Sequence, residues 1–392
     1  MPASTLHLTV ASPLYRGATI ALFLSGLGFS AAAPQIASFL VEDLGASLTA
    51  AGLFYLTSLT APVAGYLVGA RSDRTGGRLG LFRFCAVAGF AGWAAIAYST
   101  QLWMPYVISA LVLAFAGAAT SQLFAAIHDE LEARPGPNND GVVAVVRMAL
   151  TGGWVVGPVA GAFLAAHTSL RFLLLATAVC TLAQILPLGA LRTPPAARSA
   201  GASPRGPGVR AMLPLLAFTT LYVFVYAGEP IKYAYLPIYM REQLDFPAGL
   251  SGAIIGIQPL VEIVLMPVAV LVARRIGMMR LMVVGAAFGV AANVCFALTG
   301  TAAGLFAGQI LMGGVWGIFA ALGIIVAQRL LPTAVATASA IFLSSTALAS
   351  ALGGAAGGVG AAVVGLPLVF LAPAALGLLA VLGLAVMTSR RL

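Results

Sequence analysis

The chain alternates between long apolar segments and short polar punctuation made of charged residues, prolines and glycines. A helix needs roughly 20 mostly apolar residues to cross the hydrocarbon core of a bilayer, and each apolar segment has about that length. The pattern therefore predicts an all-α integral membrane protein with twelve transmembrane helices. The expected spans are 15–40, 48–70, 80–99, 103–127, 141–166, 170–191, 212–240, 248–272, 280–298, 303–327, 333–362 and 366–388.

The amino-acid composition supports this prediction and excludes several other classes of protein. Of the 392 residues, 61% are hydrophobic and 8% are charged, whereas a soluble domain has roughly 45–50% apolar and about 25% charged residues. The balance excludes a soluble enzyme, a disordered protein, a disulfide scaffold and a nucleic-acid binder. The short loops between spans also leave no room for a large catalytic domain outside the membrane, so we do not expect an enzyme.

The net charge of +9 is carried by arginines that gather at alternate junctions between the spans. They lie between spans 2 and 3, 6 and 7, and 8 and 9, and again at the end of the chain. The opposite junctions hold few basic residues and several acidic ones. Because cytoplasmic loops carry the excess of basic residues, we expect both termini in the cytoplasm.

A segment rich in Pro, Gly, Ser and Arg at 192–211 divides the chain into two groups of six spans. Such a composition does not pack a core and is typical of a linker. We expect an N-terminal six-helix bundle at 1–191, a cytoplasmic linker at 192–211 and a C-terminal six-helix bundle at 212–392. The loops at 69–78 and 272–280 are weakly similar when Gly76 is aligned with Gly277, as expected for two repeats.

The loop after span 2 reads GARSDRTGGR and, together with the twelve spans, resembles the loop signature of the major facilitator superfamily. The resemblance implies the two-bundle fold of that family and a loop that latches the halves in the outward-open state. The residues that match, and for which it implies a role in conformational gating, are Gly69, Asp73, Arg74, Gly76 and Arg78.

Span 5 carries a second resemblance, to the signature of proton-coupled antiporters of the same superfamily. Gly153, Gly157, Pro158 and Gly161 match it. Glycines four residues apart allow two helices to approach closely, and a proline removes a backbone donor. These residues either serve a gating movement or provide ordinary close packing.

Segments 121–130, 145–158 and 235–244 resemble more narrowly the bacterial sugar efflux transporters of this superfamily. This resemblance implies export of sugars or glycosides in exchange for protons, by alternating access around a site near mid-membrane. One residue departs from the family pattern, because Tyr235 stands where we expect an acidic residue two places before Pro237. The main alternative is a multidrug/proton antiporter of the same fold; a uniporter, a channel or a non-transporting membrane protein is a weaker one.

Glu229, Lys232 and Glu262 lie well inside their spans, where a charge costs roughly 2.5–3.5 kcal/mol on insertion scales. Glu229 and Lys232 are three residues apart and therefore share a helix face, and Pro230 between them favours a local break of the helix. They form either a proton-linked gate or a structural pair. Glu262, in span 8, either binds and releases a proton or stays protonated on a backbone carbonyl.

Arg147 at the inner part of span 5 lies within reach of Asp129 and Glu130 at the end of span 4. We expect Arg147 to pair with one of these acids. The pair either contributes to proton coupling, because protonating the acid frees the arginine, or is a plain salt bridge at the cytoplasmic face.

Amides and tyrosines within the spans suit a neutral polar solute, because amides bond hydroxyl groups and aromatic rings cover the C–H faces of a sugar. The candidates for substrate contact are Gln35, Gln122, Gln258, Asn293, Tyr226 and Tyr235. Each amide could instead bond a neighbouring helix.

The sequence has no GxxxxGK[ST] nucleotide-binding loop and no cluster of metal ligands. We therefore expect no cofactor and no metal, with the proton gradient as the driving force. The expected partners are a small sugar or glycoside, protons and membrane lipids, with no nucleic acid, and we expect a monomer.

Overall fold

The computed structural model describes residues 5–133, 139–191, 209–332 and 335–389, and every regular element in that part of the chain is helical. Twelve helical stretches in it are long and apolar enough to cross a membrane. The predicted all-α architecture with twelve spans is therefore confirmed. Of the predicted linker, residues 192–208 lie outside the described part.

The packing of the chain divides it into two compact units, each built around its own core. Unit 1 comprises Met1–Gln35 and Leu59–Gly201, and unit 2 comprises Ile36–Ser58 and Ala202–Leu392. The short segment at 36–58, which comes from the ends of the first two spans, packs within unit 2.

Unit 1 is a bundle whose buried core is formed by α2, α6, α9 and α10, with Leu22, Phe82 and Leu123 fully buried at its centre. Its elements are α1 (Thr5–Ala11), α2 (Pro13–Ala32), α5 (Ala61–Thr75), α6 (Arg78–Ala97), α7 (Trp103–Ile108), the π-helix η2 (Ser109–Leu113), α8 (Ala114–Ala116), α9 (Ala118–Ala133), α10 (Asn139–His167), α11 (Leu170–Ala183) and the 3-10 helix η3 (Leu186–Leu188).

In unit 2, α14, α15 and α16 pack against one another, α18 packs on α15, and α4 packs on α17. The elements are α3 (Ile36–Glu42), α4 (Leu48–Leu53), the 3-10 helix η1 (Phe54–Thr60, whose last two residues belong to unit 1), α12 (Val209–Tyr226), α13 (Gly228–Glu242), α14 (Ala248–Ile276), α15 (Met278–Leu298), α16 (Ala302–Leu330), α17 (Val335–Val364), the 3-10 helix η5 (Leu368–Phe370) and α18 (Leu371–Ser389).

Several spans are interrupted near a proline, because proline has no N–H and disfavours a helical residue before it. The first span is broken at Ala33, just before Pro34, and the second passes through η1 before Pro62 opens α5. The seventh is broken at Ala227, between α12 and α13, three residues before Pro230. Pro158 is an exception, since α10 continues through it.

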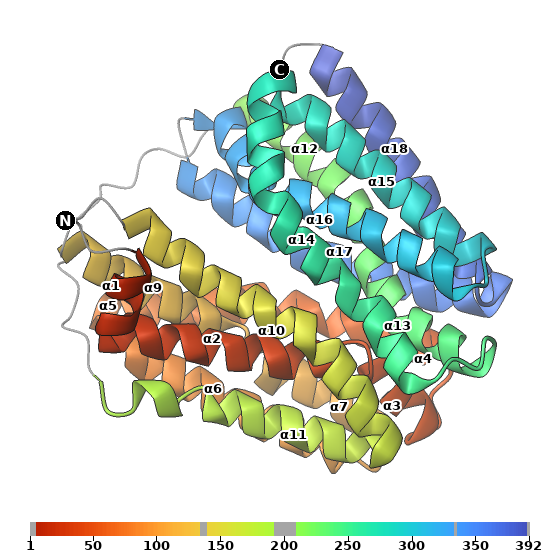
Figure 1. Cartoon of the computed structure of the whole chain (residues 1–392), viewed down its shortest axis with the longest axis horizontal. Helices are drawn as coiled ribbons and strands as arrows, with labels where there is room; N and C mark the ends of the chain where they lie inside the picture. Colours follow the sequence, from red (N-terminus) through yellow and green to blue (C-terminus); the bar gives the residue numbers. More distant parts are fainter. Residues whose placement is uncertain (1–4, 134–138, 192–208, 333–334, 390–392) are drawn as a thin grey trace. The chain divides into compact units, whose positions relative to one another are not determined.

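The span 5 glycines lie where α10 runs along α2 (Figure 1). A Cβ atom at Gly157 would lie 2.7 Å from the carbonyl oxygen of Leu27, and one at Gly161 would lie 2.5 Å from that of Ala31. At Gly153 it would lie 2.5 Å from the amide nitrogen of Leu27. Any side chain here would push the two helices apart, so the glycines permit a close backbone contact.

In both of the loops that the sequence aligned, the preceding helix ends at a glycine with positive φ. Gly76 follows α5 with φ of 64°, and Gly277 follows α14 with φ of 92°. Both values lie in a region that side-chain-bearing residues rarely adopt, so glycine at these two positions has a backbone reason. An added Cβ at Gly69, by contrast, would meet no neighbour within 4 Å.

We predict that Gly157→Ala destabilises unit 1 by about 1–3 kcal/mol. The backbones of α2 and α10 are already in contact at this position, so an added methyl group would introduce strain. Gly152→Ala on the same helix is the matched control, since its Cβ would meet only the ring of Phe23 at 3.9 Å. That control should gain a few tenths of a kcal/mol from helix propensity. Thermal unfolding of the purified protein in detergent measures both, and equal melting temperatures would contradict the tight α2–α10 contact.

Candidate functional site

The charged pair of span 7 is buried at the start of α13. The Lys232 ammonium nitrogen lies 2.7 Å from Oε2 of Glu229, and the two side chains are 1% and 7% exposed. The break at Ala227 places Glu229 in the first turn of α13, where the partial positive charge of a helix N-terminus favours a carboxylate. The predicted pairing of Glu229 with Lys232 is present in the structure.

Two neighbouring helices complete the hydrogen bonding of this pair. Trp316 of α16 donates its indole N–H to Oε1 of Glu229 at 2.5 Å, and Gln258 of α14 donates to the same oxygen at 3.4 Å. Lys232 also donates to the amide oxygen of Gln258 and lies 4.2 Å from the ring centroid of Tyr233. We call Glu229, Lys232, Gln258 and Trp316 the span 7 cluster.

Glu262 lies one helical turn beyond Gln258 on α14 and is half-buried. It is close enough for its charge to act on Lys232 and on Tyr226. The ring of Tyr226 packs edge-on against Trp316, with 5.0 Å between centroids. One ammonium group is therefore offset by two carboxyl groups inside a membrane span.

This arrangement can carry a proton without leaving an isolated charge. A buried ion pair is tolerated only when its charges offset each other and its hydrogen bonds are made. With both acids ionised the group of Glu229, Glu262 and Lys232 carries one net negative charge, and protonation of either acid makes it neutral. Among the described residues, no three side chains of metal-binding type gather in one place.

Three other residues that we expected to contact substrate, Tyr235, Asn293 and Gln35, are not part of the span 7 cluster. Tyr235 is fully buried, and its hydroxyl donates to the carbonyl of Leu48 at 2.9 Å. Asn293 donates to the carbonyl of Gly289 at 2.8 Å, while its own oxygen has no partner among the described residues. Gln35, which ends the first segment of unit 1, is 8% exposed at the break after α2.

A second polar network joins α5, α6 and α9 of unit 1. Arg78 donates to Asp129 at 2.9 Å and to the hydroxyl of Ser72 at 2.9 Å. Ser72 in turn donates to the amide oxygen of Gln122 at 2.5 Å. Gln122 is therefore engaged in a helix–helix bond.

The expected pairing of Arg147 with Asp129 or Glu130 is wrong in this structure. Arg78 reaches Asp129 from the start of α6, whereas the side chain of Arg147 on α10 is exposed and forms no ion pair with another described residue. The short loop between spans 4 and 5 allowed Arg147 to reach these acids, but in the structure the side chain of Arg147 is exposed and does not bond them. Arg74 is also exposed, and the side chain of Asp73 lies outside the described part of the structure.

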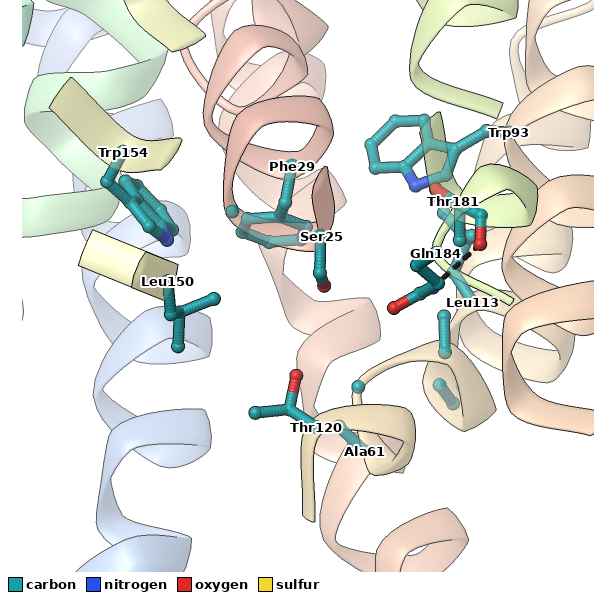
Figure 2. Close-up of a pocket in the computed structure, with 14 residues that line it drawn as sticks. Ser25, Phe29, Ala61, Trp93, Leu113, Thr120, Leu150, Trp154, Thr181 and Gln184 are labelled. Atoms are coloured by element: carbon teal, nitrogen blue, oxygen red, sulfur yellow. Dashed lines mark hydrogen bonds between the residues drawn. The ribbon is translucent and has the colours of Figure 1, made fainter. Parts of the chain in front are cut away.

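Unit 1 also contains a pocket of about 370 Å³. Figure 2 shows Gln184 reaching into it from the end of α11, with Ser25 of α2 and Thr120 of α9 on the facing side. The fourteen lining residues include none with an ionisable side chain: Ser25, Gly26, Phe29, Ala61, Trp93, Leu113, Ala114, Ala116, Gly117, Thr120, Leu150, Trp154, Thr181 and Gln184.

Sequence reasoning missed the pocket residues and two members of the polar networks. Trp316 lies in an apolar segment, and Ser72 lies close to a loop. Neither is charged, so the sequence around them does not indicate that Trp316 bonds Glu229 or that Ser72 bonds Arg78. Gln184 looks like the polar end of span 6. Its burial, which would have pointed to the pocket, is visible only in the structure.

Comparison with known proteins identifies the family. The model of the Major Facilitator Superfamily matches residues 18–334. The chain belongs to the Major Facilitator Superfamily. As a member of this superfamily it is an integral membrane transporter and not an enzyme, as the sequence predicted.

Similar proteins within the superfamily cover nearly the whole chain. A Deinococcus radiodurans protein named "Putative sugar efflux transporter" is 30% identical over 93% of this chain and 95% of its own length. The Salmonella typhimurium "Sugar efflux transporter B" is 25% identical over 87% of each chain. A crystal structure of a mutant nucleoside transporter, NupG, has a TM-score of 0.81 at 17% identity, covering 95% of this chain and 99% of that one; it shows the same fold.

We predict that Lys232→Met destabilises this superfamily member by about 3–5 kcal/mol, because it leaves the Glu229 carboxylate buried without its cation. The double variant Glu229→Gln/Lys232→Met should recover most of that loss, since no unpaired charge remains at the pair. Thermal unfolding of the wild type, both single variants and the double variant gives the coupling energy. A double variant as unstable as Lys232→Met would show that the pair is not a unit.

Proposed function

We propose that this protein exports sugars or glycosides from the cytoplasm in exchange for protons, by alternating access. It acts as a monomer in a bacterial inner membrane with both termini in the cytoplasm, and the proton gradient drives it without a bound cofactor. The sugar substrate is supported by the names of the two sugar efflux transporters that match most of the chain. The arginine distribution supports the orientation.

The span 7 cluster, with Glu262 beside it, is the observation that carries the proton coupling. Glu229 accepts hydrogen bonds from Lys232, Trp316 and Gln258, so its charged form is well solvated by the protein. Glu262 is half-buried and shares the charge of the same lysine. We assign proton binding to Glu262 and the anchoring of Lys232 to Glu229.

The charge balance links proton binding to the transport cycle. Moving a net charge out of contact with water costs more than moving a neutral group. When Glu262 is protonated, the group of Glu229, Glu262 and Lys232 is neutral, and the conformational change that seals it from water is favoured. Exchange also requires that the bound sugar, which is neutral and cannot offset the negative charge, promotes the opposite change through its own contacts while Glu262 is deprotonated.

We expect Glu262→Gln to abolish proton-driven sugar movement in proteoliposomes with an imposed pH gradient. Glutamine keeps the shape of the side chain and cannot release a proton, so the variant should retain sugar exchange between equal pH compartments. Labelled lactose, glucose and a lipophilic cation are the test solutes. Glu132→Gln is the matched control, because Glu132 is 71% exposed and, among the residues that the structure describes, forms an ion pair with His128 on the surface.

Three results would contradict the proposal in different ways. Cation movement without sugar movement in the wild type would favour a multidrug/proton antiporter. Sugar flux that ignores both the pH gradient and Glu262→Gln would indicate a uniporter. If Glu262→Gln still exported sugar with an unchanged response to the pH gradient, the proton would have to be bound by a group other than Glu262.

We also predict that Arg78→Lys lowers the maximal transport rate several-fold and leaves the sugar KM unchanged. Lysine keeps the charge, but one ammonium group does not reproduce the two directed bonds of the guanidinium to Asp129 and Ser72. None of these three residues lines the pocket of unit 1, so we expect the affinity for the sugar to stay unchanged. Arg71→Lys, at an exposed position of α5, is the control. A raised KM with an unchanged rate would overturn the gating assignment.

A further inference from the structure

The pocket of unit 1 has the size and lining of a small-molecule site that no comparison with known proteins assigns. Its volume of about 370 Å³ lies at the lower end of the roughly 300–1,000 Å³ range of such sites. Helices α2, α6, α9, α10 and α11 of one bundle all contribute to it. This size suits one ring rather than a long oligomer.

Three aromatic rings form an apolar wall of this pocket. The ring of Phe29 lies between two indoles, with its centroid 5.6 Å from Trp154 and 6.4 Å from Trp93. Figure 2 shows Trp154 and Trp93 on opposite sides of Phe29. Aromatic faces of this kind cover the C–H faces of a sugar ring, and the two indoles can also orient it.

Gln184 supplies the feature that points to a ligand. The side chain is 2% exposed, and its amide nitrogen donates to the carbonyl of Thr181 at 2.7 Å. Its amide oxygen is buried and has no hydrogen-bond partner among the described residues. In Figure 2 this oxygen points toward the side of the pocket where Ser25 and Thr120 lie. Buried acceptors are almost always satisfied, so this oxygen, which unlike the amide of Gln309 lines this pocket, is available to accept a hydrogen bond from a ligand there.

We infer that this pocket binds one ring of a neutral sugar or glycoside, with a sugar hydroxyl donating to the amide oxygen of Gln184 and a ring face against the tryptophans. The inference rests on the proposed function and assigns its substrate site. Ser25 and Thr120 offer hydroxyl groups for further bonds to the sugar rim.

The lining also sets the charge of the ligand. None of the fourteen lining residues ionises, and a buried charge without a partner is strongly disfavoured. Glucose 6-phosphate and tetraphenylphosphonium are therefore expected not to bind here, whereas glucose, lactose and methyl β-D-glucoside are candidates.

Binding of these three sugars to the purified full-length protein in nanodiscs, measured by calorimetry, tests the role of Gln184. Gln184→Leu removes the acceptor and should weaken binding by about tenfold or more. Gln309→Leu is the matched control: Gln309 is a fully buried glutamine of α16 in unit 2, with both amide atoms lacking partners among the described residues. The affinity of the Gln309→Leu variant for the sugars should stay within about twofold of the wild-type affinity.

A labelling experiment locates the site without relying on Gln184→Leu folding well. Ser25→Cys is placed in a chain whose three native cysteines, Cys85, Cys180 and Cys295, are replaced by alanine. The rate of reaction of this thiol with N-ethylmaleimide should fall at least several-fold when the best-bound sugar is added. Glucose 6-phosphate at the same concentration should leave the rate unchanged.

The outcomes separate the site from the function. If the sugars bind and are transported, yet Gln184→Leu behaves like Gln309→Leu and Ser25→Cys is not protected, the pocket assignment is overturned while sugar export stands. If no sugar binds or is transported and tetraphenylphosphonium does, the proposed function is overturned together with the pocket. Sugar protection of Ser25→Cys with loss of affinity in Gln184→Leu supports both.

Discussion

The buried charge of Lys232 is the constraint around which unit 2 is organised. It is the only lysine of the chain and is 1% exposed within a membrane span. Such a charge persists only if its surroundings replace water. Helix α13 supplies Glu229, α14 supplies Gln258, and α16 supplies Trp316, so the ion pair of Glu229 and Lys232 is hydrogen-bonded by side chains of two neighbouring helices. Glu262 lies one helical turn beyond Gln258 on α14. The net charge of this cluster together with Glu262 would change on protonation of either acid, and the proposed proton coupling rests on that charge balance.

Backbone irregularities place these side chains. The break at Ala227 begins a new helix just before Glu229, so the carboxylate sits in the first turn with the favourable end of the helix dipole. In unit 1, the glycines of α10 bring it against the backbone of α2, and both helices contribute residues to the pocket. Close packing of α2 and α10 thus sets the distance between Phe29 and Trp154. A rigid bundle around a preformed pocket is the arrangement expected of a selective site.

The sequence was informative where one helix or one apolar segment decides the outcome. Span positions follow from hydropathy, and the Glu229–Lys232 pair follows from a three-residue spacing on one helix. The alignment of the loops at 69–78 and 272–280 paired Gly76 with Gly277, and the structure gives both glycines a positive φ. Contacts between spans were not predictable in the same way. Asp129 has two arginines within reach along the chain, and only the packing of α5, α6 and α9 selects Arg78. Gln184 could not be distinguished from other amides at span ends, because only the folded structure shows that its amide oxygen is buried without a hydrogen-bond partner among the described residues.

The central claim is that proton and sugar exclude each other, and proton release on binding tests it most directly. Lactose, glucose or methyl β-D-glucoside is added to the purified protein in weakly buffered solution containing a pH indicator. The account predicts release of protons on binding of the sugar by the wild type and none by Glu262→Gln, with the sugar still bound. Sugar binding without any proton release by the wild type, across the pH range in which it transports, would contradict exchange.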